Sequence, residues 1–162
     1  TFCNRRATNT APGDYRWLEG GFTASFSGDR QTSPMVFSVT GNTLIAQDMT
    51  AGVIQTVRMT NFSFIDTMGL DGSFTLDHDY TVACVTLGGS VTVNMTTPFT
   101  IYTGDNNPSV GVVVVSGANG ASIKLSAIDN LTAQIEYDLD GDGTYGNGTD
   151  PVLKVVNWAD LG

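Results

Sequence analysis

Charged side chains are scarce in this chain, and basic ones are the scarcest. Asp, Glu, Lys and Arg make up 14% of the residues, with 7 Lys and Arg against 16 Asp and Glu, so the net charge is −9. An average soluble domain is about 25% charged. Because most of the surface of such a chain repels nucleic acid, we expect no nucleic-acid partner.

Cysteines and long apolar runs are also few. The chain has two cysteines, Cys3 and Cys84, which is an even number. Its lysine-poor, threonine-rich composition is of the kind usually found in exported proteins. This predicts one disulfide that ties the N-terminal segment to a central strand, with two free thiols as the alternative. No apolar run reaches about 18 residues, so the sequence predicts no membrane span.

Motifs of catalysis are missing as well. His78 is the single histidine and lies between Asp77 and Asp79, and a Ser-His-Asp arrangement would need a serine that the sequence does not mark. No Gly-x-Ser-x-Gly elbow, His-Glu-x-x-His helix or phosphate-binding glycine loop occurs. We therefore expect no catalytic residues and no enzyme, with His78 a solvated residue beside a strand.

Threonine, serine, glycine and alternating apolar residues make up much of the chain. Residues 90–95 and 131–139 alternate apolar and polar side chains with the period of two that is typical of a half-buried strand. Such runs recur about every 8 to 12 residues between short turns, which predicts an all-β fold of about ten strands. The expected architecture is an antiparallel β-sandwich or a partly closed meander barrel. Residues 1–15 should form an extended N-terminal arm, and residues 16–162 a single all-β domain.

An acidic segment has the spacing of a calcium loop. Carboxylates occupy loop positions 1, 3 and 5, and Gly143 at position 6 permits the sharp bend that turns their oxygens inward. Position 12 lacks the bidentate glutamate, so Asp150 would serve from the next position and the site would be weak. The predicted calcium ligands are Asp138, Asp140, Asp142, Thr144 and Asp150. The alternative is a metal-free hairpin turn, because Asp-Gly pairs between strands favour hairpins.

The same part of the chain carries a family resemblance. The resemblance rests on the run Gly111 to Val115, on the run Tyr137 to Gly143, which contains D-x-D-G-D-G, and on the ending Val155 to Leu161, which contains W-x-x-L. From Pro108 onward the chain resembles a group of uncharacterised exported β-rich proteins of proteobacteria. The resemblance implies bacterial export and an acidic turn between two strands, and it implies no active site. The chain departs from the group by inserting Gly146-Asn147-Gly148 in the turn.

The charge is unevenly distributed along the chain. Residues 1–58 carry five arginines against four carboxylates, whereas residues 59–162 carry two lysines against twelve carboxylates. A basic end and an acidic end favour head-to-tail contact between copies, and the alternative is that the acidic residues only keep the domain soluble.

These features predict a non-enzymatic structural or adhesive surface protein. It would be the subunit of an extracellular fibre, assembled by an N-terminal arm that adds a strand to the sheet of a neighbour. The alternative is a monomeric secreted or periplasmic β module that binds a small ligand, with Trp17 and Trp158 as stacking surfaces. The expected location is extracellular or at the cell surface, and the periplasm is the second choice.

Overall fold

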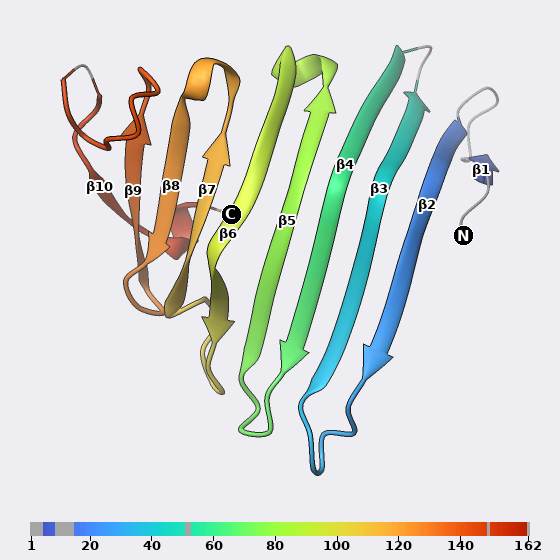
Figure 1. The fold of residues 1–162 in the computed structure, drawn as a ribbon, viewed down its shortest axis with the longest axis horizontal. Coiled ribbons are helices and arrows are strands. Elements are labelled where there is room, and N and C mark those ends of the chain that lie inside the picture. The colour runs from blue at the N-terminus through green and yellow to red at the C-terminus, as the bar shows by residue number, and fades with distance from the viewer. Residues whose placement is uncertain (1–4, 9–14, 51–52, 149, 162) are drawn as a thin grey trace.

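The computed structural model (Figure 1) describes residues 5–8, 15–50, 53–148 and 150–161. Within these ranges the chain forms strands and three single-turn 3-10 helices, and no α-helix. The strands are β1 (Arg5–Thr8), β2 (Tyr15–Ser27), β3 (Met35–Thr50), β4 (Val53–Met68), β5 (Phe74–Cys84), β6 (Gly89–Ile101), β7 (Val110–Ser116), β8 (Ser122–Ala127), β9 (Thr132–Asp138) and β10 (Lys154–Asn157). The 3-10 helices are η1 (Val85–Leu87), η2 (Ala118–Gly120) and η3 (Trp158–Asp160).

The strands form one antiparallel sheet in the order β1-β2-β3-β4-β5-β6-β7-β8-β9-β10, so each strand pairs with its neighbours in the sequence. Figure 1 shows this meander running from the blue β2 to the red β10. No pairing joins β1 to β10 in the described residues, and the sheet is therefore open. The predicted all-β antiparallel class is confirmed. The sandwich and the barrel are not confirmed, because short hairpins keep successive strands in one sheet, whereas a sandwich needs connections that cross between two.

The two faces of this sheet differ in chemistry. Residues paired across neighbouring strands share a face. The face that we call the apolar face contains, on β2 to β5, the residues Ala24, Phe26, Met35, Phe37, Val39, Phe64, Asp66, Met68, Phe74, Leu76 and His78. On the opposite face, hydroxyl groups pair across strands, with 2.8 Å between the Oγ atoms of Ser25 and Ser38 and 3.0 Å between the Oγ1 atoms of Thr81 and Thr92. The alternation in the sequence thus separates an apolar face from a hydroxyl-rich one.

The long strands bend along a line of bulges. The register shifts between Gly21 and Thr23, between Thr60 and Ser63, and between Leu76 and Tyr80. At this bend Phe62 is 3% exposed, and its ring lies so close to Gly41 that a Cβ atom at position 41 would clash with Cζ of the ring. Asn61 takes a left-handed conformation with φ 49°, which a short polar side chain tolerates better than a β-branched one.

The buried core lies mainly in the second half of the sheet. Phe99, Val113 and Ala133 are at most 8% exposed. Trp158, in η3, packs edge-on against Phe99 with 6.0 Å between ring centroids, and its indole Nε1 donates a hydrogen bond to the backbone oxygen of Asp129. The segment after β10 therefore covers the apolar side of β6 to β9, and Trp158 is a packing residue.

The predicted N-terminal arm falls only partly within the described residues. Residues 5–8 form β1, which pairs with β2 of the same chain from Arg5–Leu18 to Thr8–Tyr15. The rest of residues 1–14 lies outside the described ranges.

The predicted disulfide between Cys3 and Cys84 is not confirmed. Cys84 carries a free thiol at the end of β5, and Cys3 lies outside the described residues. Arg5 and Cys84 lie in one register row, through Leu18, Ala46 and Val57. Four strand spacings at about 4.8 Å separate their Cα atoms by roughly 19 Å. A disulfide needs Cα atoms within about 7 Å, a distance that Arg5 on β1 exceeds.

Candidate functional site

The acidic loop, residues 138–150, leaves the end of β9 and returns towards β10. Asp138 is 2% exposed, and its carboxylate accepts hydrogen bonds from the backbone N–H groups of Gly141 at 2.8 Å, Asp142 at 3.2 Å and Gly143 at 3.1 Å. Gly141 and Gly143 have φ values of 76° and 85°, which glycine adopts without steric cost. The first carboxylate of the motif therefore organises the turn through which the other acidic residues are placed.

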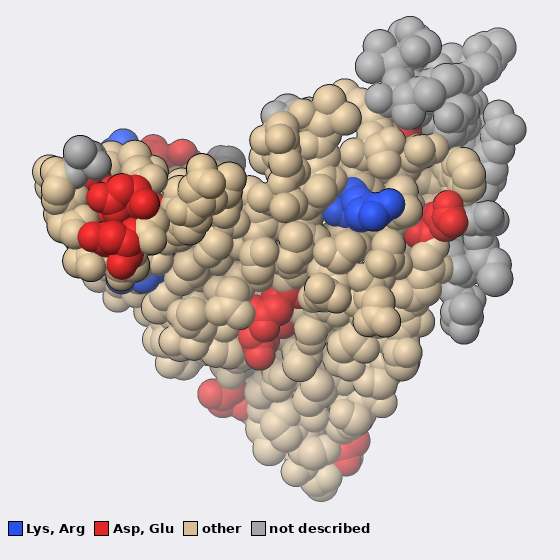
Figure 2. Space-filling model, turned by 45° about the horizontal axis from the view of Figure 1, so that its top comes forward, with Lys and Arg blue, Asp and Glu red and all other residues tan. Residues whose placement is uncertain are grey.

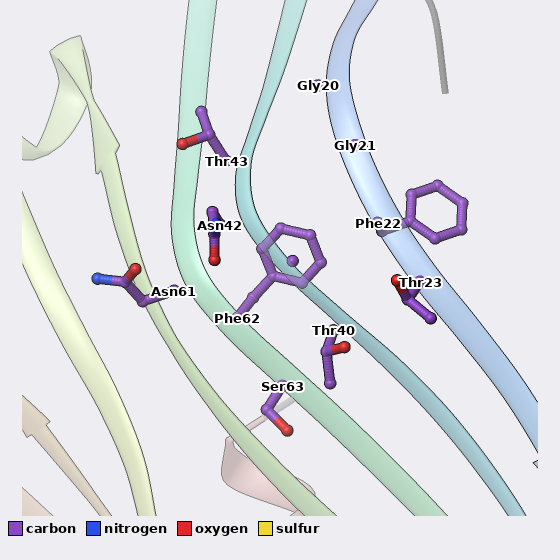
Figure 3. Close-up of a pocket in the computed structure, with 11 residues that line it drawn as sticks. Gly20, Gly21, Phe22, Thr23, Thr40, Asn42, Thr43, Asn61, Phe62 and Ser63 are labelled. Atoms are coloured by element: carbon purple, nitrogen blue, oxygen red, sulfur yellow. The ribbon is translucent and has the colours of Figure 1, made fainter. Parts of the chain in front are cut away.

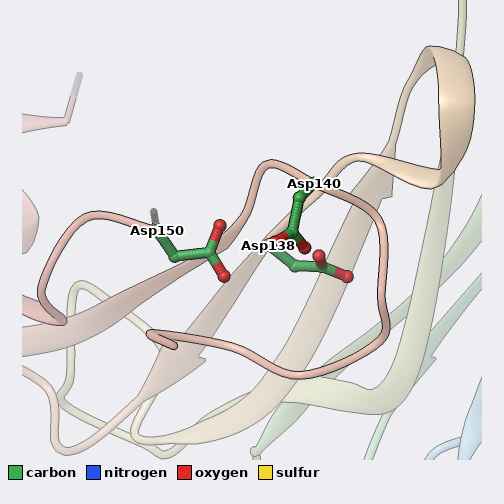
Figure 4. A group of neighbouring side chains, drawn as sticks. All are labelled: Asp138, Asp140 and Asp150. Atoms are coloured by element: carbon green, nitrogen blue, oxygen red, sulfur yellow. The ribbon is translucent and has the colours of Figure 1, made fainter. Parts of the chain in front are cut away.

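Three carboxylates meet inside this loop. One oxygen from each of Asp138, Asp140 and Asp150 lies within 4.8 Å of the other two. Figure 4 shows Asp138 and Asp140 close together, with the carboxylate of Asp150 directed towards them from the other side. Calcium binds oxygen at about 2.3–2.6 Å, so two oxygens on one ion lie up to about 5 Å apart, and the spacing of this cluster fits a single ion.

Two oxygens of the loop are buried without a hydrogen-bond partner. They are Oδ2 of Asp150 and Oδ1 of Asn147. The other oxygen of Asp150 accepts a hydrogen bond from the backbone N–H of Leu139 at 2.7 Å, which ties the end of the loop to its beginning. Asn147 is not among the residues that the sequence predicted for this site. Its only indication in the sequence is its place in the Gly146-Asn147-Gly148 insertion. The donor set is all oxygen, as a hard cation such as calcium prefers.

Asp142, another predicted ligand, does not belong to this group of three carboxylates, and Thr144 stays a predicted ligand. The carboxylate of Asp142 accepts hydrogen bonds from the side-chain amide of Asn147 at 2.9 Å and from the backbone N–H of Thr144 at 2.7 Å. These hydrogen bonds, that of Asn147 above all, hold the pKa of Asp142 below its ordinary value. The structure thus brings together Asp138, Asp140 and Asp150 and gives Asp142 a role in fixing Asn147.

The acidic loop is anchored to the neighbouring strands. The hydroxyl of Tyr145 lies 2.9 Å from Oγ of Ser122 on β8, and the ammonium group of Lys124 stands 4.4 Å from the centre of the Tyr145 ring. The same ammonium group forms an ion pair with Glu136 on β9 at 2.7 Å. These contacts give the loop a fixed position at the edge of the sheet, as a binding site requires.

A second concave region lies at the bend of the sheet (Figure 3). It is a shallow cleft of about 780 Å³ across β2, β3 and β4. Its lining is rich in hydroxyl and amide side chains: Thr23, Thr40, Asn42, Thr43, Asn61 and Ser63, with the Phe62 ring among them. Such a lining offers hydrogen bonds and one apolar surface, and no charged side chain belongs to it.

The single histidine has a partner on the apolar face. Nε2 of His78 lies 2.7 Å from Oδ1 of Asp66, one strand away. The neighbouring Asp79 accepts hydrogen bonds from the backbone N–H of Met95 at 2.9 Å and from the side-chain amide of Asn94 at 3.0 Å, where the pairing of β5 with β6 is interrupted. His78 was predicted to be a solvated residue, but its side chain is only 26% exposed. Its position on β5, opposite Phe64, places it on the apolar face.

No protein-family model, curated protein or solved structure matches the chain. Among the described residues, no helix has the length and apolar character needed to cross a membrane.

Proposed function

We propose that this chain is a non-enzymatic structural or adhesive surface protein that forms an extracellular fibre by continuing its sheet from copy to copy. The observation that carries the proposal is the open sheet, because β1 and β10 each pair on one side alone within the described residues. The unpaired N–H and C=O groups of an edge strand are a template for another strand. Adding the β1 edge of one copy to the β10 edge of the next is a head-to-tail contact, which gives an open filament.

The β10 edge has features that suit an added strand. A groove of about 380 Å³ runs beside it, lined by Ile135, Tyr137, Val156 and Leu161 among others. Val155 is 54% exposed at the same edge. In strand addition, backbone hydrogen bonds supply affinity and such a groove receives alternate side chains of the incoming strand.

Charge supports the same polarity of assembly. The sequence of β1 contains Arg5 and Arg6. The opposite end of the sheet carries the acidic loop, and Figure 2 shows red carboxylates gathered there, at the left of the view. Opposite charges at the two ends favour head-to-tail encounter, and salt should weaken it because exposed charges are screened over about 8 Å at physiological ionic strength.

The test is the assembly state of the purified full chain. Negative-stain images and size-exclusion chromatography should show long assemblies, and both deletion of residues 1–15 and the double substitution Arg5→Glu/Arg6→Glu should shorten them. Arg30→Glu is the matched control, because Arg30 lies in the turn between β2 and β3 and should leave assembly intact. Monomers at all concentrations, or polymers that survive both changes at residues 1–15, would refute the proposal.

We also propose that Asp138, Asp140 and Asp150 bind calcium weakly and brace the acidic loop. Three carboxylates within 4.8 Å repel one another, and a divalent cation between them relieves this repulsion. The site would lack a bidentate glutamate, and a weak affinity suits extracellular fluid, where sites in the range of about 10⁻⁴–10⁻³ M are filled. The proposed location is extracellular or at the cell surface, with the periplasm second.

The alternative function, a monomeric module that binds a small ligand, is favoured by the cleft at the bend. Its volume of about 780 Å³ lies within the range of about 300–1,000 Å³ that ligand sites occupy. Trp158 does not serve it as a stacking surface, because its ring packs against Phe99. Under this alternative the native protein is a monomer, so the same size measurement separates the two functions.

A further inference from the structure

The apolar face of β2 to β5 is not covered within the described residues. Phe26 is 62% exposed and Phe37 is 44% exposed, whereas Phe99, which Trp158 covers, is 7% exposed. These phenylalanines lie in one register row, Phe26 opposite Phe37 on β3 and Phe99 further along on β6. A sheet that is apolar on one face needs a second layer to bury it. On β6 Phe99 is covered by Trp158, whereas Phe26 and Phe37 have no such cover among the described residues.

The uncovered part has a shape that another layer can fill. Side chains of β2 to β5 surround an apolar dent of about 160 Å³, lined by Phe26, Met35, Phe37, Asp66, Met68 and Phe74. Phe26 is one of these lining residues and is 62% exposed, so it is open to a partner. In a two-fold pair each copy offers the same surface to the other.

The surface area of the chain agrees with a missing partner. The accessible surface is 9888 Å², whereas a compact monomer of 17.1 kDa exposes about 7,750 Å², a difference of about 2,100 Å². A standard protein interface removes about 800 Å² from each partner, so less than half of this difference would supply a stable dimer. The four strands, spaced at about 4.8 Å, present roughly 760 Å² of sheet face over their full length of about twelve residues each, and roughly 320 Å² over the part below the bend, where each contributes about five residues.

Few titratable side chains stand on the face that two copies would share. Between the bend and the turn that joins β2 to β3, the described part of the apolar face of β2 to β5 has two of them, Asp66 and His78, and these two pair with each other. Each copy therefore brings one carboxylate to this part of the face, with a hydrogen-bond partner in the same copy. The acidic loop lies beyond β9, away from β2 to β5 (Figure 1).

We propose that the apolar faces of two copies pack against each other, so that two chains form the two layers of a β-sandwich. The layers would lie about 10 Å apart, as in sandwiches made by one chain. This pairing goes beyond the proposed fibre contact, because it joins faces and leaves both edges free. A fibre built with it would be two chains thick.

The test uses Phe26→Lys with Ser25→Lys as its matched control. Ser25 is the neighbouring residue on β2, exposed on the hydroxyl face, so it receives the same new charge on the other side of the sheet. The mass of the full chain is measured by sedimentation velocity. If the chain forms fibres, each variant also carries Arg5→Glu/Arg6→Glu, which should prevent fibre growth. The parent and Ser25→Lys should have twice the mass of 17.1 kDa, and Phe26→Lys should dissociate at least about 100-fold more readily, because a charge would be buried in an apolar interface.

A second measurement does not depend on a variant. Binding of the dye ANS to the parent chain should fall as protein concentration rises through the dimer midpoint, because pairing covers the apolar face. A monomeric parent at about 100 μM, or a Phe26→Lys chain that folds and dimerises as well as Ser25→Lys, would overturn the pairing. Phe26-dependent flotation with phosphatidylcholine vesicles would also overturn it, by identifying a lipid surface as the partner. Dimers without fibres would refute the proposed fibre and leave this pairing standing.

Discussion

Nε2 of His78 lies 2.7 Å from Oδ1 of Asp66, and the two side chains form a polar pair on the apolar face of β4 and β5. The ring of Phe64 stands edge-on to His78 with 5.0 Å between centroids, so packing as well as hydrogen bonding holds the imidazole. The side chains are 26% and 29% exposed, and each depends on the other for a partner on a largely apolar surface.

Replacing one member of this pair should lower the free energy of unfolding more than replacing both. Asp66→Leu and His78→Phe should each lower the free energy of unfolding by about 1–3 kcal/mol, because each leaves a half-buried polar group without its partner. The double variant should recover most of that loss, since an apolar pair suits the surface. Urea denaturation at one protein concentration completes the double-mutant cycle. Strictly additive losses would show that the two side chains do not act as a pair.

The bend of the sheet depends on glycine at position 41 but not at position 21. A Cβ atom at position 41 would meet the Phe62 ring and, at 2.6 Å, the backbone oxygen of Gly21. Gly41→Ala should therefore lower the free energy of unfolding by about 1–3 kcal/mol, as overpacking does. Gly21→Ala is the control on the adjacent strand, because a Cβ atom there has nothing within 4 Å. Equal midpoints for the two variants in urea would contradict the proposed contact.

The sequence predicted the strands well and the arrangement of layers poorly, for one physical reason. Alternation at residues 90–95 correctly indicated that β6 has an apolar and a polar face. Alternation reports that a face avoids water and carries no information on what covers it, so a sandwich was expected where the chain forms one open sheet. The contact between Gly41 and Phe62 joins different strands and depends on a bulge at Asn61, which no local pattern indicates.

The candidate site was predicted in part for a similar reason. The spacing of a calcium loop indicated Asp138, Asp140 and Asp150, and the structure places their carboxylates together. That they bind calcium stays a prediction. Asp142 lies outside this group of three carboxylates, and Thr144, which carries no carboxylate, stays a predicted ligand. That spacing assumes a loop between helices, whereas β9 delivers Asp138 to the turn as a buried acceptor of three backbone N–H groups, which turns Asp142 towards Asn147.

Calcium should stabilise the chain through the cluster alone. At about 10 mM calcium, a site with a Kd of about 1 mM contributes about 1.4 kcal/mol, which should raise the melting midpoint by a few degrees, and EGTA should reverse the rise. Asp140→Asn and Asp150→Asn should abolish the calcium-dependent rise. Asp77→Asn is the matched control and should retain it, because Asp77 lies on β5, outside the acidic loop. If calcium does not change the melting midpoint of the parent chain, the proposal that this site binds calcium is wrong.

Acid should loosen the turn between β8 and β9 through Asp129. Its carboxylate accepts hydrogen bonds from the backbone N–H groups of Leu131 at 2.9 Å and Thr132 at 2.7 Å. These bonds, that of Leu131 first, hold the pKa of Asp129 below its ordinary value. A carboxyl group whose pKa is lower in the folded state stabilises the fold above the unfolded pKa of about 3.9, and this contribution is lost as pH falls through the folded pKa.

Asp129→Asn should therefore melt a few degrees below the parent chain at pH 7, and the gap should narrow as pH falls below about 4. Thermal melts from pH 7 to pH 2 measure the gap. Asp77→Asn, which changes a carboxylate on the hydroxyl-rich face of β5, controls for the loss of one negative charge. The hydrogen bonds to the ionised Asp129 carboxylate are weakened when it is protonated, so the difference in melting midpoint between Asp129→Asn and the parent chain should shrink in acid. A difference that stays constant from pH 7 to pH 2 would mean that the substitution destabilises the turn for steric reasons instead.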